Sequence, residues 1–285
     1  MFTLGILHTT IRADEKLLMA AAEQKGVTVK LIDVRTEIFH PATYKPEFDL
    51  AIERCVSTVK GTYATHFLES IGITVVNSSA IASVCEDKFL TSLALERAHV
   101  PTPAFALAFG PEEAKQAVER LGGFPVVIKP NLGSWGRLLA KINDMDALEA
   151  IVEHKDVLGS PEHKAIYLQA YVNKPGRDIR VFVIDGEAIC AIYRTSPHWI
   201  TNTARGGAAT NCPLNPELVK IAKAASDAVG GGILALDVFE AADGYTINEI
   251  NHTMEFKNSE APTGVSISGA MIDYCIKVYN AQKTA

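Results

Sequence analysis

Residues 233–251, which read ILALDVFEAADGYTINEIN, hold two apolar runs on either side of a polar turn. The runs are typical of strands, and the Ala-Ala-Asp-Gly sequence between them favours a β-hairpin. A turn centred near residue 243 sets Asp237 opposite Glu249, and Asn251 shares the face of Glu249 because side chains alternate along a strand. The hairpin therefore gathers two carboxylates and an amide oxygen on one face.

These three side chains predict a metal site. Like charges directly opposed destabilise a hairpin unless a cation lies between them, and both carboxylates interrupt otherwise apolar strands. Oxygen ligands with an incomplete shell suit Mg²⁺, which phosphates and water complete. The alternative is that Asp237 and Glu249 pair with neighbouring lysine or arginine side chains. We expect Asp237, Glu249 and Asn251 to bind the metal.

A second candidate site begins at Lys129, which ends an apolar run and precedes the loop NLGSWGR of residues 131–137. A lysine followed by glycines suits a polyphosphate, because backbone N–H groups can approach its oxygens and the ammonium neutralises charge. The alternative is an ordinary hairpin connection. Lys88, early in a helix expected over residues 86–99, is by default a solvated surface residue.

Arginines gather in the second half of the chain, at Arg177, Arg180, Arg194 and Arg205. Guanidinium groups bind carboxylate and phosphate oxygens in bidentate fashion, although each arginine alone is by default a surface residue. Arg205 lies in the loop TNTARGG of residues 201–207, whose donors favour an anion-binding loop over a plain connector. The histidines show no metal-binding spacing and are expected to be structural, including His252, which is predicted to point to the opposite strand face.

The order of predicted elements indicates an α/β protein with an α+β insertion. Strands and helices alternate at the start of the chain, which predicts a small parallel α/β domain over residues 1–87 without a phosphate-loop motif. A pair of prolines then marks a crossing, and a compact α+β lid is expected over about residues 101–175, within a body of residues 88–285. A long polar loop is expected between Arg194 and Asn215, and a final helix ends near Tyr279.

The composition excludes several classes of protein. Apolar residues at 48% and charged residues at 21% are typical of soluble globular chains, and a net charge of −6 leaves no overall positive field for nucleic acid or anionic membranes. Five cysteines without a C-x-x-C pair favour a reducing cytoplasm over a disulfide framework or a zinc site. The chain shows neither an export signal nor a membrane-spanning run. We expect a cytoplasmic protein.

Taken in chain order, the motifs resemble those of the ATP-grasp ligases. They are Lys88, IKP at 128–130, GSWG at 133–136, YLQAYV at 167–172, GRDIR at 176–180, Asp237, and EIN at 249–251. The nearest branch is that of the ribosomal-protein-type glutamate ligases, and the resemblance spans almost the whole chain. It implies an ATP-grasp fold that follows a small N-terminal α/β domain.

The resemblance also implies the ligands and the residues that hold them. The implied nucleotide contacts are Lys88, Lys129, Gly133, Ser134, Trp135, Gly136, Arg137, Gln169, Ala170, Tyr171, Val172, Asp178, Arg180, Arg194 and Asn202. The implied cofactors are ATP and two Mg²⁺ ions, the ions held by Asp237, Glu249 and Asn251. Adenine would meet backbone groups of residues 169–172. Relatives commonly carry Gln-Glu where this chain has Gln169-Ala170, so a ribose contact from that carboxylate is absent.

Within this branch, residues 202–207 and 249–258 resemble the ligases that join an amino acid to the C-terminal glutamate of LysW, a small acidic amino-group carrier protein. The Asn258-Ser259 pair resembles the version that takes α-aminoadipate in lysine biosynthesis, whereas the glutamate version has Gly-Phe there. The implied substrate contacts are Asn202, Thr203, Arg205, Asn258 and Ser259. The resemblance also implies a dimer or a tetramer.

The implied reaction has two steps: ATP phosphorylates the carrier's terminal carboxylate, and the amino acid's α-amine attacks the acyl phosphate. We expect Arg194 or Arg205 to act catalytically by steadying the oxyanion. The alternatives are a glutamate-specific or dual-specific ligase of arginine biosynthesis, a kinase on the same scaffold, and a non-catalytic nucleotide-binding module. Because the protein itself is acidic, its arginines would have to form a local positive mouth for an acidic carrier.

Overall fold

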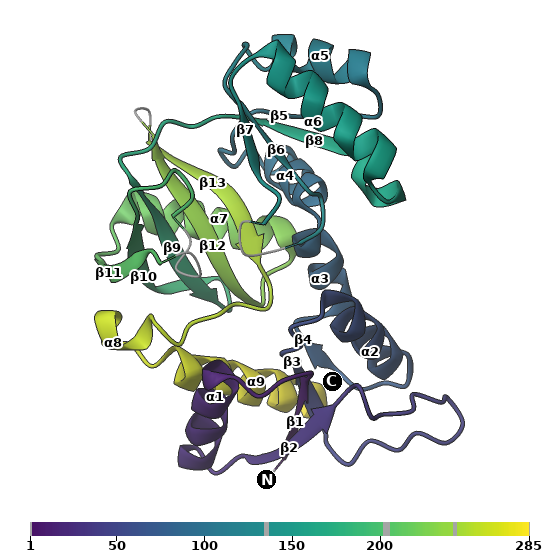
Figure 1. Ribbon diagram of the computed structural model, residues 1–285. Helices are drawn as coiled ribbons and strands as arrows, with labels where there is room; N and C mark the ends of the chain where they lie inside the picture. Colours follow the sequence, from purple (N-terminus) through teal and green to yellow (C-terminus); the bar gives the residue numbers. More distant parts are fainter. Residues whose placement is uncertain (1, 134–136, 202–205, 242–243, 285) are drawn as a thin grey trace.

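The computed structural model describes residues 2–133, 137–201, 206–241 and 244–284, and within them the chain folds around three β-sheets (Figure 1). In the view of Figure 1 an upper sheet lies at the top, a large central sheet in the middle and an N-terminal sheet at the bottom. None of the helices in these ranges combines the length and the apolar character needed to cross a membrane.

The N-terminal sheet is parallel, with the strand order β2-β1-β3-β4. Its elements are β1 (Thr3–His8), α1 (Ala13–Gln24), β2 (Thr28–Asp33), β3 (Leu50–Glu53), α2 (Thr58–Ser70), β4 (Val75–Val76) and α3 (Ser79–Glu86). Leu4, Ile6 and Leu50 are fully buried, as expected for strands that are covered on both faces. The parallel α/β arrangement predicted for this part of the chain is confirmed.

The C-terminal helix α9 (Ile267–Thr284) returns to the N-terminal sheet and extends beyond Tyr279, where the sequence predicted its end. Met271 and Cys275 of this helix share one apolar core with Leu18 of α1 and Phe182 of the central sheet. The N-terminal and central sheets are therefore packed against a common core.

The upper sheet is antiparallel, with the strand order β5-β8-β6-β7. Its elements are β5 (Phe105–Ala108), α5 (Pro111–Arg120), β6 (Val126–Lys129), β7 (Ala140–Ile142), α6 (Met145–Leu158), a 3₁₀ turn (Pro161–Lys164) and β8 (Ile166–Ala170). Helices α5 and α6 lie on one side of the sheet (Figure 1), where Ala114 and Leu148 share a core with Ile128 and Leu168. This is the α+β arrangement that the sequence predicted for the lid.

The central sheet has the strand order β11-β10-β9-β12-β13, and each neighbouring pair is antiparallel. Its elements are α4 (Lys88–Arg97), β9 (Arg177–Ile184), β10 (Glu187–Thr195), β11 (Ala208–Cys212), α7 (Pro216–Val229), β12 (Ile233–Ala241), β13 (Gly244–Asn251) and α8 (Glu260–Thr263). Helix α7 packs through Leu218 and Ala222 onto Val181 and Leu236 of the sheet.

Two further predictions of secondary structure are wrong. The helix expected over residues 86–99 starts later, because Asp87 is extended and its side chain accepts hydrogen bonds from the N–H groups of Phe89 and Leu90, which begins α4. The polar loop expected before Asn215 contains strand β11, whose sequence AATNC is too polar to stand out as a strand.

Candidate functional site

A cleft lies between the upper and central sheets, and we call it the upper cleft. Its apolar side chains include Val127, Tyr171, Trp199, Ile200 and Phe239, and its cationic side chains are Lys88, Lys129, Arg137, Lys174 and Arg194. An apolar wall beside a cluster of positive charge suits a ligand with an aromatic base and a polyphosphate.

Lys129 lies at the end of β6, a strand that is buried along its whole length. Its Nζ donates to Gln169 Oε1 at 2.5 Å and to Asn248 Oδ1 at 2.7 Å. Burial lowers the pKa of Lys129 to about 8, and the positive charge of Lys88 adds to this effect while Glu249 opposes it. An anionic ligand would favour the charged form of this ammonium and raise its pKa again.

Lys88 is the first residue of α4 and is buried, so the default interpretation as a solvated surface lysine is wrong. Its Nζ donates to the backbone oxygen of Gly133 at 2.5 Å and lies 3.5 Å from Glu249 Oε1. This lysine links the start of the glycine loop to the carboxylate side of the central sheet.

The predicted adenine segment, residues 169–172, lines the upper cleft. The N–H of Ala170 donates to Ala104 O at 2.8 Å and that of Tyr171 to Pro125 O at 3.2 Å, so backbone carbonyl groups of the protein already occupy both donors. The Lys141 ammonium lies over the Tyr171 ring, 3.7 Å from its centroid. Recognition of adenine by this segment stays a prediction.

The hairpin of β12 and β13 sets Asp237 opposite Glu249, as predicted. Nearer the turn the register differs from the prediction, because Val238 faces Ile247 and Asn248 is an extra residue in β13. The side chain of Asn248 is the one that accepts from Lys129. The bulge thus adds a polar contact that strict alternation did not predict.

Two arginines neutralise Asp237 in this structure. Arg180 donates to both its oxygens, at 2.8 and 3.0 Å, and Arg194 Nη2 lies 3.0 Å from Oδ2. Burial alone would raise the pKa of Asp237, but the two guanidinium groups outweigh it and lower the pKa to about 2. The alternative that the sequence left open, in which the two carboxylates pair with arginine and lysine side chains, is therefore seen in this structure. Asp237 pairs with the two arginines, and Glu249 lies near Lys88.

Arg194 is almost fully buried and is held from both sides. It donates to Asp178 through Nε at 2.7 Å and Nη2 at 2.8 Å, while Thr201 and Lys174 also contact this carboxylate. Such bidentate pairing fixes the orientation of the guanidinium. Arg180, expected beside the nucleotide, instead lines the neighbouring cleft described next.

A second cleft, which we call the lower cleft, lies between the central sheet and the N-terminal sheet. Four residues line both clefts: Gly133, Arg194, Asp237 and Glu249. From the N-terminal part of the chain the lower cleft receives Arg12, Glu53, Cys55, Val56, Thr58, Cys85 and Glu86. None of these N-terminal residues was predicted to line a site. A signal was available, because Arg12 and Cys55 follow β1 and β3, and ligands of parallel α/β sheets bind at the carboxyl ends of strands.

The three predicted metal ligands meet at the junction of the clefts, where Asp237 and Glu249 line both and Asn251 lines the lower one. The Nδ2 atom of Asn251 is buried without a hydrogen-bond partner in the described part of the chain, so the amide group has an unused polar atom at this junction. Two carboxylates and an amide oxygen beside open space fit a hard divalent cation. His252, predicted to be structural, lies in the wall of the lower cleft, with Nε2 3.5 Å from Glu86 Oε1.

A small side pocket adjoins the lower cleft. It is lined by Arg180, Ile192, Arg194, Glu255, Lys257, Asn258 and Ser259. The two predicted specificity residues therefore lie beside the two arginines, with Ser259 buried and Asn258 exposed. The other predicted contacts Ser134, Trp135, Gly136, Asn202, Thr203 and Arg205 lie outside the described residues.

A model of the RimK-like ATP-grasp domain matches residues 85–275, and a model of the LysX preATP-grasp domain matches residues 4–84. The chain belongs to the RimK-like ATP-grasp family. The solved structure of a RimK domain ATP-grasp protein from Sphaerobacter thermophilus is 26% identical to this family member, with a TM-score of 0.81 over 95% of this chain and 98% of the other.

Two curated relatives that match this RimK-like protein over nearly their whole length are ligases. The alpha-aminoadipate–LysW ligase LysX of Saccharolobus solfataricus is 34% identical over 92% of this chain and 96% of the relative. The glutamate–LysW ligase ArgX of Sulfurisphaera tokodaii is 33% identical over 95% and 96%. The RimK-like protein is thus an ATP-dependent ligase that forms an amide bond.

Proposed function

We propose that this ligase joins α-aminoadipate to the C-terminal glutamate of a LysW-type carrier protein and converts ATP to ADP and phosphate. The observation that carries the proposal is the meeting of two clefts at Arg194, Asp237 and Glu249. One cleft suits a nucleotide, and the other is open to a carboxylate and an amine. The similarity to ligases named for LysW supports the choice of carrier.

The reaction proceeds in two displacements. A carboxylate oxygen of the carrier's terminal glutamate attacks the γ-phosphorus of ATP, the bond to the bridging oxygen breaks, and ADP leaves an acyl phosphate behind. The α-ammonium of the amino acid releases one proton, and the neutral amine then attacks the acyl carbon. The carbon–oxygen bond to phosphate breaks, the nitrogen loses a proton, and an amide and inorganic phosphate result.

The chain's own residues mainly position the reactants and neutralise the negative charge of the phosphates. Lys129 and Lys88 would lie beside the phosphates, where a bound triphosphate compensates the burial of the ammonium groups. Asp237, Glu249 and Asn251 would hold Mg²⁺, which supplies further neutralisation of the phosphate oxygens. Enclosure between the upper and central sheets would keep water away from the acyl phosphate.

Arg194 is our candidate for stabilising the oxyanion of the acyl transfer. Its guanidinium is held by Asp178 and Asp237 and lines both clefts and the side pocket, so it needs no reorientation as charge develops. Arg205 is proposed to share this role. Asn202 and Thr203 are proposed to contact the substrate.

The preference for α-aminoadipate rests on Asn258 and Ser259, which line the side pocket next to Arg180. Replacement of the pair by Gly-Phe should shift the kcat/KM ratio from α-aminoadipate toward glutamate by at least tenfold. Equal ratios before and after the exchange would contradict this assignment. A glutamate-specific ligase is the second candidate, because ArgX is nearly as similar to this chain as LysX is.

The proposal is tested by measuring ADP release with purified carrier, ATP and a panel of amino acids. ADP release that requires both the carrier and α-aminoadipate, with a carrier product heavier by one aminoadipyl group, supports the proposal. A phosphorylated product that persists without an amine would instead indicate a kinase.

A further inference from the structure

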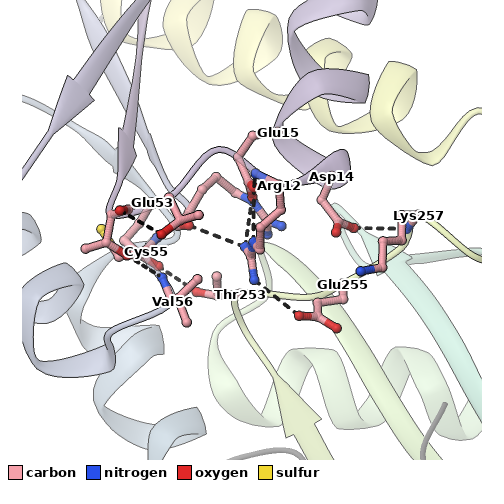
Figure 2. Close-up of polar contacts among 12 residues, drawn as sticks. Arg12, Asp14, Glu15, Glu53, Cys55, Val56, Thr253, Glu255 and Lys257 are labelled. Carbon is pink, nitrogen blue, oxygen red and sulfur yellow. Dashed lines mark hydrogen bonds and ion pairs between the residues drawn. The ribbon is translucent and has the colours of Figure 1, made fainter. Parts of the chain in front are cut away.

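The loop of residues 253–257, which follows β13, is fastened to the N-terminal part of the chain (Figure 2). The fully buried Asp14 accepts hydrogen bonds through Oδ1 from the backbone N–H of Phe256 at 2.6 Å and of Lys257 at 2.9 Å. Thr253 donates from Oγ1 to Glu53 at 2.6 Å. The loop therefore has a fixed position between the central sheet and the start of α1.

Glu255 projects from this fixed loop and lines both the lower cleft and the side pocket. Its Oε1 lies 3.2 Å from Nη1 of Arg12 and accepts a hydrogen bond from it (Figure 2). Its side chain is 30% exposed, and Oε2 has no hydrogen-bond partner among the described residues. The carboxylate is thus oriented from one side and open on the other.

Arg12 is shared between Glu255 and Glu15, and the buried Arg54 also contacts Glu15 at 3.2 Å. Arg12 donates to Glu15 through Nε at 3.0 Å and through Nη2 at 2.8 Å, in a bidentate arrangement. Glu53 and Glu86 add negative charge to the same wall of the lower cleft. The N-terminal wall is therefore acidic, whereas Arg180 and Arg194 line the wall that belongs to the central sheet.

We propose that Glu255 binds the α-ammonium group of the incoming amino acid, an inference that rests on the proposed ligase function. A carboxylate with a free oxygen at the entrance of a pocket is a suitable receptor for an ammonium group. Lys257 and Arg180 line the side pocket beyond it and are placed for the carboxylates of a dicarboxylic amino acid. The nitrogen is then held in the two cavities that Arg194 also lines.

The competing explanation is that Glu255 serves only to fasten the loop to Arg12. The variant Glu255→Gln separates the two roles, because glutamine keeps an oxygen that accepts from Arg12 but loses the negative charge. A matched control is Asp273→Asn in α9, whose carboxylate lies 2.7 Å from Lys25 at the end of α1 and lines none of the three cavities described above. Both variants remove one acidic charge from an ion pair with the α1 region.

The assay uses the intact enzyme with ATP, Mg²⁺ and a LysW-type carrier, and offers either α-aminoadipate or hydroxylamine as the nucleophile. Hydroxylamine is uncharged at neutral pH, so it traps the acyl phosphate as a hydroxamate without an ammonium receptor. For Glu255→Gln we expect the KM for α-aminoadipate to rise at least tenfold, while hydroxamate formation and the KM for ATP change less than twofold. Asp273→Asn should match the wild type in every measurement.

Two results would overturn the inference alone, provided that the wild type forms the hydroxamate. One is a KM for α-aminoadipate within twofold of the wild type in Glu255→Gln, and the other is a parallel loss of hydroxamate formation, which a purely structural role predicts. Thermal unfolding of each variant shows whether the fold is retained. A wild-type enzyme that forms no hydroxamate with the carrier would overturn the proposed function, and the inference with it.

Discussion

The protonation of Lys129 should make nucleotide binding depend on pH in a predictable way. Burial lowers its pKa from 10.5 to about 8 in the free protein, so the side chain is about 90% charged at pH 7 and about 10% charged at pH 9. A bound triphosphate favours the charged form and raises this pKa again. Nucleotide binding above pH 8 must therefore take up a proton, and the affinity should fall roughly tenfold between pH 7 and pH 9.

Isothermal titration calorimetry measures this uptake directly. Titration with a non-hydrolysable ATP analogue and Mg²⁺, in buffers of different ionisation enthalpy, should give about 0.8 proton taken up per nucleotide at pH 8.5 and about 0.1 at pH 7. The variant Lys129→Met keeps an unbranched side chain without a titrating group, so its binding should be weaker and its uptake at pH 8.5 close to zero. Equal uptake by wild type and variant would refute the reasoning.

The same pKa has a consequence for the free protein. Between pH 8 and pH 10.5 the unfolded chain binds more protons at this lysine than the folded chain does. The contribution of Lys129 therefore raises the free energy of unfolding as the pH rises. The full gain is about 3 kcal/mol. The difference in unfolding free energy between wild type and Lys129→Met, measured by denaturant titration across this range, isolates the contribution from those of other groups.

Three further predictions concern the metal, the nucleotide and the carrier. Asp237→Asn should reduce ADP release at least a hundredfold. It should also lower the free energy of unfolding by about 3 kcal/mol, because Arg180 and Arg194 lose the buried carboxylate with which they pair. Full turnover by this variant would contradict the metal assignment. Ala170→Glu should lower the KM for ATP severalfold in steady-state assays and leave that for the amino acid unchanged. Carrier affinity, measured by titration, should weaken at least tenfold from low to high salt, and no change would argue against a positive docking mouth.

The hairpin was predictable because its signal is local. Two apolar strands and a polar turn fix which residues face each other, and the pairing of Asp237 with Glu249 follows. The sequence did not reveal the bulge at Asn248, because a bulge depends on contacts with other elements, here Lys129 of the upper sheet. That contact brings together residues far apart in the chain.

The residues that were misjudged owe their positions to tertiary packing. Lys88 has the sequence context of a surface lysine, yet it is buried and contacts Gly133 and Glu249. Arg12 and Glu255 are distant in sequence, and only the packing of α1 against the 253–257 loop makes them neighbours. Local patterns identify elements and motifs, whereas the walls of a cleft between sheets depend on how the sheets are placed.

The most direct test of the central claim is the mass of the carrier after reaction. With ATP, Mg²⁺ and α-aminoadipate, the LysW-type carrier should gain one aminoadipyl group in parallel with ADP release, and it should gain much less of a glutamyl group when glutamate is offered. A carrier of unchanged mass under conditions where ATP binds, or an equal gain from glutamate, would contradict the account.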